Sequence, residues 1–119
     1  MNDNQKTVEE LKKEIRAFME ERDWQQYHTP KNMSMQIATE AAELMEPFMF
    51  VESSASMQEL EKKRTAVENE VADVAICLLN FCMRTNIDLT QAIANKMIIN
   101  AEKYPVEKCK GRRDKYNEL

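Results

Sequence analysis

Four acidic residues form two pairs with the same spacing, each set in a stretch that is otherwise mostly apolar. Glu40 and Glu43 interrupt one such stretch, and Glu70 and Asp73 stand at the start of the apolar run 71–83. On a helix, residues i and i+3 lie on one side, about 5–6 Å apart at their Cβ atoms, so two carboxylates can hold one ion. Acidic residues are rarely buried without a partner, because an isolated charge there is costly. The pairs therefore predict four carboxylates that converge and are neutralised.

Basic side chains or a cation could neutralise these carboxylates. Neither stretch carries a Lys or Arg within one turn of its acidic pair, which favours a metal, while structural ion pairs stay open as the alternative. Carboxylate ligands without histidine suit Mg²⁺, with Mn²⁺ as a second option, whereas di-iron centres in helical bundles use Glu-x-x-His. Mg²⁺ bound in this way keeps positions for water and phosphate oxygens. This predicts phosphoryl or nucleotidyl chemistry.

The composition predicts a single all-α domain. One glycine and three prolines in 119 residues are too few for a turn-rich β fold and indicate long helices. The net charge of −4 gives no electrostatic basis for binding a nucleic acid polymer. The odd number of cysteines, without a CxxC pair, indicates a reduced protein. No signal peptide or membrane span is visible, so a cytoplasmic location without membrane partners is expected.

Apolar periodicity and capping residues predict four helices. They cover about residues 7–22, 32–46, 56–85 and 88–104. Thr7 with Glu10 and Ser56 with Glu59 have the spacing of capping boxes, and Asp88 is expected to cap the last helix. The third helix is apolar on all sides from Val71 onward, which is typical of the interior of a bundle. Beyond Pro105, residues 106–119 are expected to form a flexible basic end.

The loop between the first two predicted helices carries Trp24, Tyr27 and the single histidine, His28. It is either a hydrophobic plug over the end of the bundle or part of a ligand mouth. The residues alone favour the plug, because aromatic side chains bury a large area wherever they lie.

The order of these motifs resembles a known family, the all-α nucleoside triphosphate pyrophosphohydrolases of the MazG type. The likeness rests on the two acidic pairs followed by Lys96-Met97-x-x-Asn100-x-x-Lys103-Tyr104-Pro105. The segments 21–32 and 113–119 make the dCTP pyrophosphatase branch of the family the nearest likeness. The resemblance covers nearly the whole chain from the first helix onward.

This resemblance implies a MazG-like domain over residues 1–119, a four-helix bundle that assembles as a homodimer or homotetramer. It implies Mg²⁺-dependent cleavage of a nucleoside triphosphate, with dCTP as one candidate, to a monophosphate and pyrophosphate, a house-cleaning activity on nucleotide pools. The implied metal ligands are Glu40, Glu43, Glu70 and Asp73, with Glu43 also orienting the attacking water. The implied substrate-binding residues are Trp24, His28, Asn32, Phe50, Lys96 and Asn100. On this basis the aromatic loop becomes a ligand mouth.

The chain departs from the dCTP branch at four positions of the base pocket and its surroundings. The residues concerned are Ile15, Phe50, Cys77 and Ile98, where the branch has a histidine, a tryptophan, a tyrosine and an acid. The choice of base is therefore open. Two functions from other classes are also open: a non-enzymatic helical oligomerisation module, and a sensor that binds nucleotide and metal without turnover.

Overall fold

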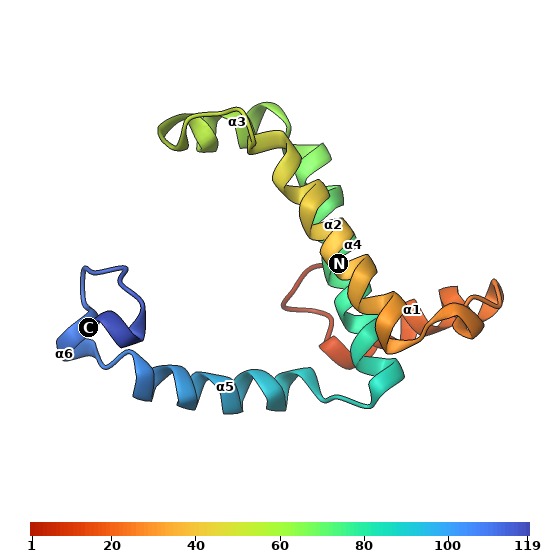
Figure 1. Ribbon diagram of the computed structural model, residues 1–119. Helices are drawn as coiled ribbons and strands as arrows, with labels where there is room; N and C mark the ends of the chain where they lie inside the picture. Colours follow the sequence, from red (N-terminus) through yellow and green to blue (C-terminus); the bar gives the residue numbers. More distant parts are fainter. The chain divides into compact units, whose positions relative to one another are not determined.

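The computed structural model describes residues 1–119 and contains helices but no strand, as the composition predicts. The chain divides into two compact units, residues 1–86 and 87–119. The first unit contains α1 (Val8–Glu21), α2 (Pro30–Met45), α3 (Ser56–Lys62) and α4 (Arg64–Thr85), with 3₁₀ turns at Gln25–Tyr27, Glu46–Phe48 and Ser53–Ala55 (Figure 1). The second unit contains α5 (Leu89–Lys103), α6 (Val106–Cys109) and a 3₁₀ turn at Tyr116–Glu118. No helix is both long enough and apolar enough to cross a membrane.

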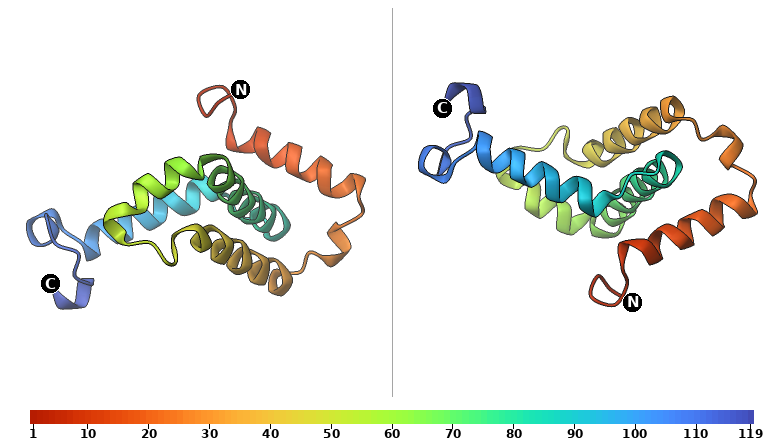
Figure 2. Two further views of the ribbon diagram at one scale, coloured as in Figure 1. Left: turned by 90° about the horizontal axis from the view of Figure 1, so that it is seen from above. Right: turned by 90° about the horizontal axis from the view of Figure 1, so that it is seen from below.

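Helices α2 and α4 form the centre of the first unit. They lie side by side and run antiparallel, because the chain turns back through α3 between them, and α1 packs against α4 (Figures 1 and 2). The buried apolar residues are Met33 of α2 and Val67, Leu79 and Cys82 of α4. This small core fixes the register of α2 against α4, and that register determines which polar side chains meet between the two helices.

Three helices begin at side-chain caps. The Thr7 hydroxyl accepts from the backbone N–H of Glu10 at 3.1 Å, and the Glu10 carboxylate accepts from the N–H of Thr7 at 3.4 Å, which confirms the predicted capping box. The Asp88 carboxylate accepts from the N–H of Gln91 at 2.8 Å, as predicted. Helix α2 begins at Pro30, two residues before the predicted start at Asn32. Proline suits the first helical position, where Thr29 supplies the cap.

The predicted third helix is wrong in one respect, because it is broken at Lys63. This residue has φ −116° and ψ 25°, and its N–H is shared between the carbonyls of Glu59 and Leu60. The predicted capping box at Ser56 is also absent, since the Ser56 hydroxyl donates to the Ser53 carbonyl at 2.7 Å. No proline or glycine marks this break, so periodicity could not locate it. The break separates the short α3 from the helix that carries the second acidic pair.

Helix α4 is less buried in the single chain than its apolar sequence predicts. Val71 is 50% exposed, and Ile76 and Leu78 are each 38% exposed. Helix α5 in the second unit also exposes apolar side chains, among them Ile93, Met97 and Ile98. Burial of these residues therefore requires contacts beyond those made within their own unit.

The end of the chain contains more structure than the sequence predicts. The rings of Tyr104 and Tyr116 meet edge to face with centroids 6.2 Å apart, and the Lys103 ammonium lies 4.7 Å from the centroid of the Tyr116 ring. Arg112 also pairs with Asp114 at 2.9 Å. Within the second unit, the last residues thus fold back onto the end of α5.

Candidate functional site

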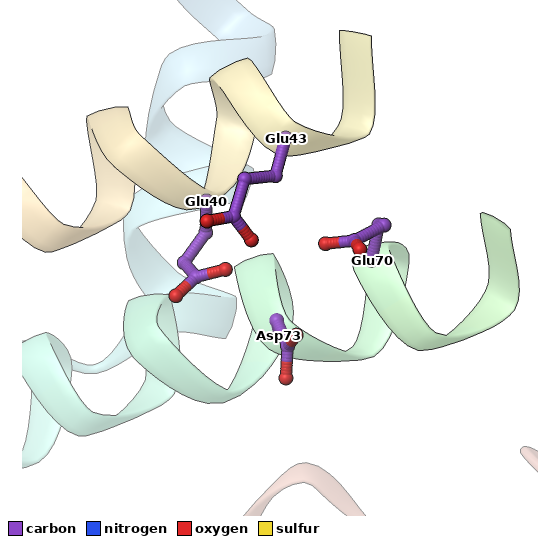
Figure 3. Close-up of side chains that lie close together, drawn as sticks. All are labelled: Glu40, Glu43, Glu70 and Asp73. Atoms are coloured by element: carbon purple, nitrogen blue, oxygen red, sulfur yellow. The ribbon is translucent and has the colours of Figure 1, made fainter. Parts of the chain in front are cut away.

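The two acidic pairs converge, as the sequence predicts. Glu40 and Glu43 project from α2 towards α4, which carries Glu70 and Asp73 (Figure 3). One carboxylate oxygen from each residue lies within 4.8 Å of the corresponding oxygens of the other three. We call these four residues the acidic cluster. The i, i+3 spacing places both acids of a pair on one side of their helix, and the packing of α2 on α4 brings the two pairs together.

No basic side chain forms an ion pair with the acidic cluster. One oxygen of Glu40 and one of Glu70 are buried and have no hydrogen-bond partner. Desolvation raises the pKa of Glu40, and hydrogen bonding to Glu43 and the negative charges nearby raise it further. Desolvation also raises the pKa of Glu70, followed by the charges of Glu43 and Asp73. The cluster therefore holds negative charge that no ion pair within residues 1–86 compensates.

A divalent cation fits this site. The donors are all carboxylate oxygens, which hard cations prefer. The two oxygens without a hydrogen-bond partner would gain one by coordinating the cation. In an octahedral shell with Mg–O distances of about 2.1 Å, opposite oxygens lie about 4.2 Å apart, which is close to the 4.8 Å limit of the cluster. The alternative of structural ion pairs finds no support, because the cluster has no basic partner.

A cavity of about 340 Å³ lies beside the aromatic loop, in the same unit as the acidic cluster. Its lining consists of Trp24, Tyr27, His28, Asn32, Met33 and Gln36. Three predicted substrate-binding residues, Trp24, His28 and Asn32, thus line one cavity. Trp24 is 44% exposed and His28 is partly exposed. The loop therefore forms an open hollow rather than a closed plug.

The cavity walls are held by local contacts. The ring of Trp24 meets that of Phe18 edge to face at 5.7 Å, and the guanidinium of Arg22 lies 3.6 Å above the Phe18 ring. The Asn32 side chain donates to the Tyr27 carbonyl at 3.1 Å. These contacts tie the loop to α1 on one side and to the start of α2 on the other.

Sequence reasoning missed one polar residue, Asn80, which does not line the cavity but contacts two of its lining residues, His28 and Met33. Asn80 is only 6% exposed, and its amide nitrogen lies 3.2 Å from Nδ1 of His28. The available signal was the amide of Asn80, which is the one polar side chain of the apolar run from Val74 to Met83. A buried polar group there needs a hydrogen-bond partner.

The remaining predicted substrate-binding residues do not line the cavity. Phe50 follows the 3₁₀ turn after α2 and is 95% exposed. Lys96 and Asn100 lie one turn apart on α5, in the second unit. Their roles stay predictions.

Comparison with known proteins decides the family. The model of the MazG-like family matches residues 35–119, which include both acidic pairs and extend across both compact units. The chain belongs to the MazG-like family.

Relatives of this MazG-like chain include dCTP pyrophosphatase 1 from Mus musculus, 34% identical over 115 residues, which cover 95% of this chain and 68% of the relative. The Homo sapiens protein of the same name is 32% identical with the same coverage. A crystal structure of a pyrophosphatase from Archaeoglobus fulgidus has a TM-score of 0.81 and 39% identity, covering 88% of this chain and 98% of that one. These matches confirm the family and the all-α fold predicted from the sequence, and support the predicted class of nucleotide pyrophosphatase.

Proposed function

We propose that this MazG-like chain is a divalent-cation-dependent nucleoside triphosphate pyrophosphohydrolase. The observation that carries the proposal is the acidic cluster, in which four carboxylates from two helices meet without a basic partner. The pyrophosphatases among its relatives give the reaction class. Magnesium is the ion we propose, because the ligands are all oxygen atoms and the substrate carries phosphates.

In the proposed reaction, water attacks the α-phosphorus, and the bond from that phosphorus to the oxygen bridging to the β-phosphorus breaks. The products are a nucleoside monophosphate and pyrophosphate. A cation bound by Glu40, Glu43, Glu70 and Asp73 supplies neutralisation of phosphate charge and a lowered pKa of water. Glu43 accepts a hydrogen bond from the attacking water and takes its proton, and the bridging oxygen leaves with the pyrophosphate.

The cavity beside the aromatic loop is the proposed place of the base. Trp24 offers an aromatic face for stacking, and His28 and Asn32 offer polar contacts. We propose a deoxynucleoside triphosphate as the substrate, with dCTP first among the candidates, because the relatives are dCTP pyrophosphatases. Lys96 and Asn100 are proposed to bind the triphosphate and Phe50 to contact the base, on the basis of the family motif alone.

We also propose that the active form is a homodimer or homotetramer. The exposed apolar residues of α4 and α5 support this proposal, since their burial against a second copy would remove them from water.

The deciding experiment is to incubate the protein with each of the four deoxynucleoside triphosphates and Mg²⁺, and to measure pyrophosphate and orthophosphate separately. We expect pyrophosphate and the monophosphate in equal amounts, and no product after chelation of the cation. Release of orthophosphate would refute the proposed reaction. Nucleotide binding without product would favour a sensor, and an absence of both binding and a metal-dependent melting shift would favour an oligomerisation module.

A further inference from the structure

The orientation of the Asn80 amide determines the direction of its contact with His28. The amide nitrogen of Asn80 can only donate, so Nδ1 of His28, at 3.2 Å, must accept. A neutral imidazole with an acceptor at one nitrogen carries its proton on the other. The contact therefore requires His28 to hold its proton on Nε2, on the opposite edge of the ring.

A second contact orients the amide of Asn80. Its nitrogen also lies 3.7 Å from the sulfur of Met33, a weak acceptor. Asn80 and Met33 are 6% and 2% exposed, so water does not compete for either contact. Rotating the amide by half a turn would put its oxygen at Nδ1, where it could accept from an Nδ1–H. It would also put that oxygen against the sulfur, which has no proton to donate, so the contact with Met33 favours the nitrogen on this side. The amide thus points its donor at the ring.

The surroundings keep the ring neutral. Desolvation lowers the pKa of His28, and the positive charge of Arg84 lowers it further. Arg84 is held near the loop, where its guanidinium donates to the Gln25 carbonyl at 3.5 Å. A neutral ring with Nδ1 engaged leaves Nε2–H as its one donor, and His28 lines the cavity together with Trp24.

We propose that Asn80 is a positioning residue that fixes the Nε2–H tautomer of His28, so that the cavity presents a hydrogen-bond donor to a carbonyl oxygen of the nucleobase. Trp24 supplies the stacking surface and His28 reads the edge of the base. That the ligand is a nucleotide rests on the proposed function, whereas the tautomer does not.

The tautomer can be measured directly, because His28 is the single histidine of the chain. In the full chain labelled with ¹⁵N-histidine, long-range ¹H–¹⁵N correlations should show a protonated Nε2 and an unprotonated Nδ1. In Asn80→Asp the carboxylate can only accept a hydrogen bond, so Nδ1 should become protonated and donate to it. Asn80→Leu keeps the number and branching of the side-chain heavy atoms but offers no hydrogen-bond partner, and should give a mixture of tautomers. Cys82→Ala, at another buried position of α4, should leave the spectrum unchanged. Protonated Nδ1 or a mixture in the wild type would overturn the proposal.

The consequence for the ligand is measured with dCTP as the probe. Loss of one neutral hydrogen bond predicts a KM raised roughly fivefold to tenfold in Asn80→Leu and Asn80→Asp, with kcat unchanged. His28→Gln, whose amide nitrogen reaches the place of Nε2, should retain a low KM. His28→Asn, whose shorter amide reaches only the place of Nδ1, should not. Cys82→Ala should behave as the wild type.

The two measurements separate the possible failures. If the wild type hydrolyses dCTP and Asn80→Leu loses the single tautomer without a change in KM, the contact with the base is refuted and the proposed function stands. If the wild type hydrolyses no deoxynucleoside triphosphate, the proposed function fails. The proposed contact with the base is then refuted when ¹⁵N spectra of His28 do not change on addition of dCTP and Mg²⁺.

Discussion

At the scale of single residues, Glu43 has a special position within the acidic cluster. Hydrogen bonding to Glu43 contributes to the raised pKa of both Glu40 and Glu70, so Glu43 lies between them. A residue in this position can contact both a bound cation and the water that the charge of the cation activates. This is the physical basis for assigning the water to Glu43 rather than to Asp73, which is the most exposed member of the cluster.

We predict that Glu43→Gln lowers kcat for pyrophosphate release by about 10²–10⁴-fold, the range for loss of a general base. The matched control is Glu46→Gln, three residues further along and outside the cluster, which should keep its kcat. The measurement is pyrophosphate release at saturating nucleotide and Mg²⁺. Equal activity of Glu43→Gln and the wild type would exclude this residue as the base.

The raised pKa of Glu70 predicts how stability depends on pH in the absence of metal. Because its pKa in the folded state exceeds the ordinary value of 4.5, the folded state binds more protons than the unfolded state between these two values. Glu70 therefore destabilises the protein at neutral pH, and this effect is relieved as the pH falls through the raised pKa and is gone below 4.5.

We expect Glu70→Gln to melt at a higher temperature than the wild type at neutral pH in a chelator, with the difference shrinking as the pH falls. Glu61 is the control, because its pKa shifts in the opposite direction: hydrogen bonding to Arg64 lowers the pKa of Glu61. Glu61→Gln should melt at or below the wild-type temperature at neutral pH. Mg²⁺ should raise the melting temperature of the wild type more than that of Glu70→Gln. A wild type that melts higher than Glu70→Gln at neutral pH without metal would contradict the expectation.

At the scale of elements, the start of α5 depends on Asp88. Its carboxylate accepts from the N–H of Gln91 at 2.8 Å and satisfies a donor that the helix itself cannot. This cap defines the residue at which the helix begins. It thereby sets the side of the helix on which Lys96 and Asn100 lie.

We predict that Asp88→Ala destabilises the protein by about 1 kcal/mol, the usual cost of losing such a cap. Hydrogen exchange at the N–H of Gln91 should accelerate in the variant, and urea unfolding gives the free energy. Thr90→Ala, in the same turn without a capping role, is the control and should leave both measurements near the wild type. Unchanged exchange at Gln91 in Asp88→Ala would show that the cap contributes nothing.

At the scale of the whole molecule, several large apolar residues of α5 have little cover from the rest of their own unit. Ile93, Met97 and Ile98 of α5 are 53%, 60% and 63% exposed, and soluble monomers rarely leave such residues next to one another at the surface. In the proposed homo-oligomer, a second copy of the chain would bury these residues.

We therefore expect light scattering to give a mass of two or four chains, and specific activity to fall when the protein is diluted until it dissociates. Ile93→Glu should weaken the assembly by placing a charge on the apolar side of α5. Asn95→Glu adds the same charge at a polar position of the same helix and should leave the mass unchanged. A monomer with full activity at all concentrations would refute the oligomer.

The sequence by itself determined the helical class, the family, the caps at Thr7 and Asp88 and the four acids of the cluster. The caps and the two acidic pairs follow from local spacing, because helical geometry places residues i and i+3 on one side and capping depends on neighbours in the chain. The helical class follows from composition, and the family from the resemblance of the motifs.

Only the tertiary structure decided the break at Lys63, which no proline or glycine marks, and the exposure of Val71, which depends on what packs against α4. It also decided the contact of Asn80 with His28. These residues are 52 positions apart in the sequence, and only the packing of α2 and its preceding loop on α4 brings them together. Periodicity identifies the side of a helix that is buried, whereas the partner of a buried polar group is set by how two helices meet.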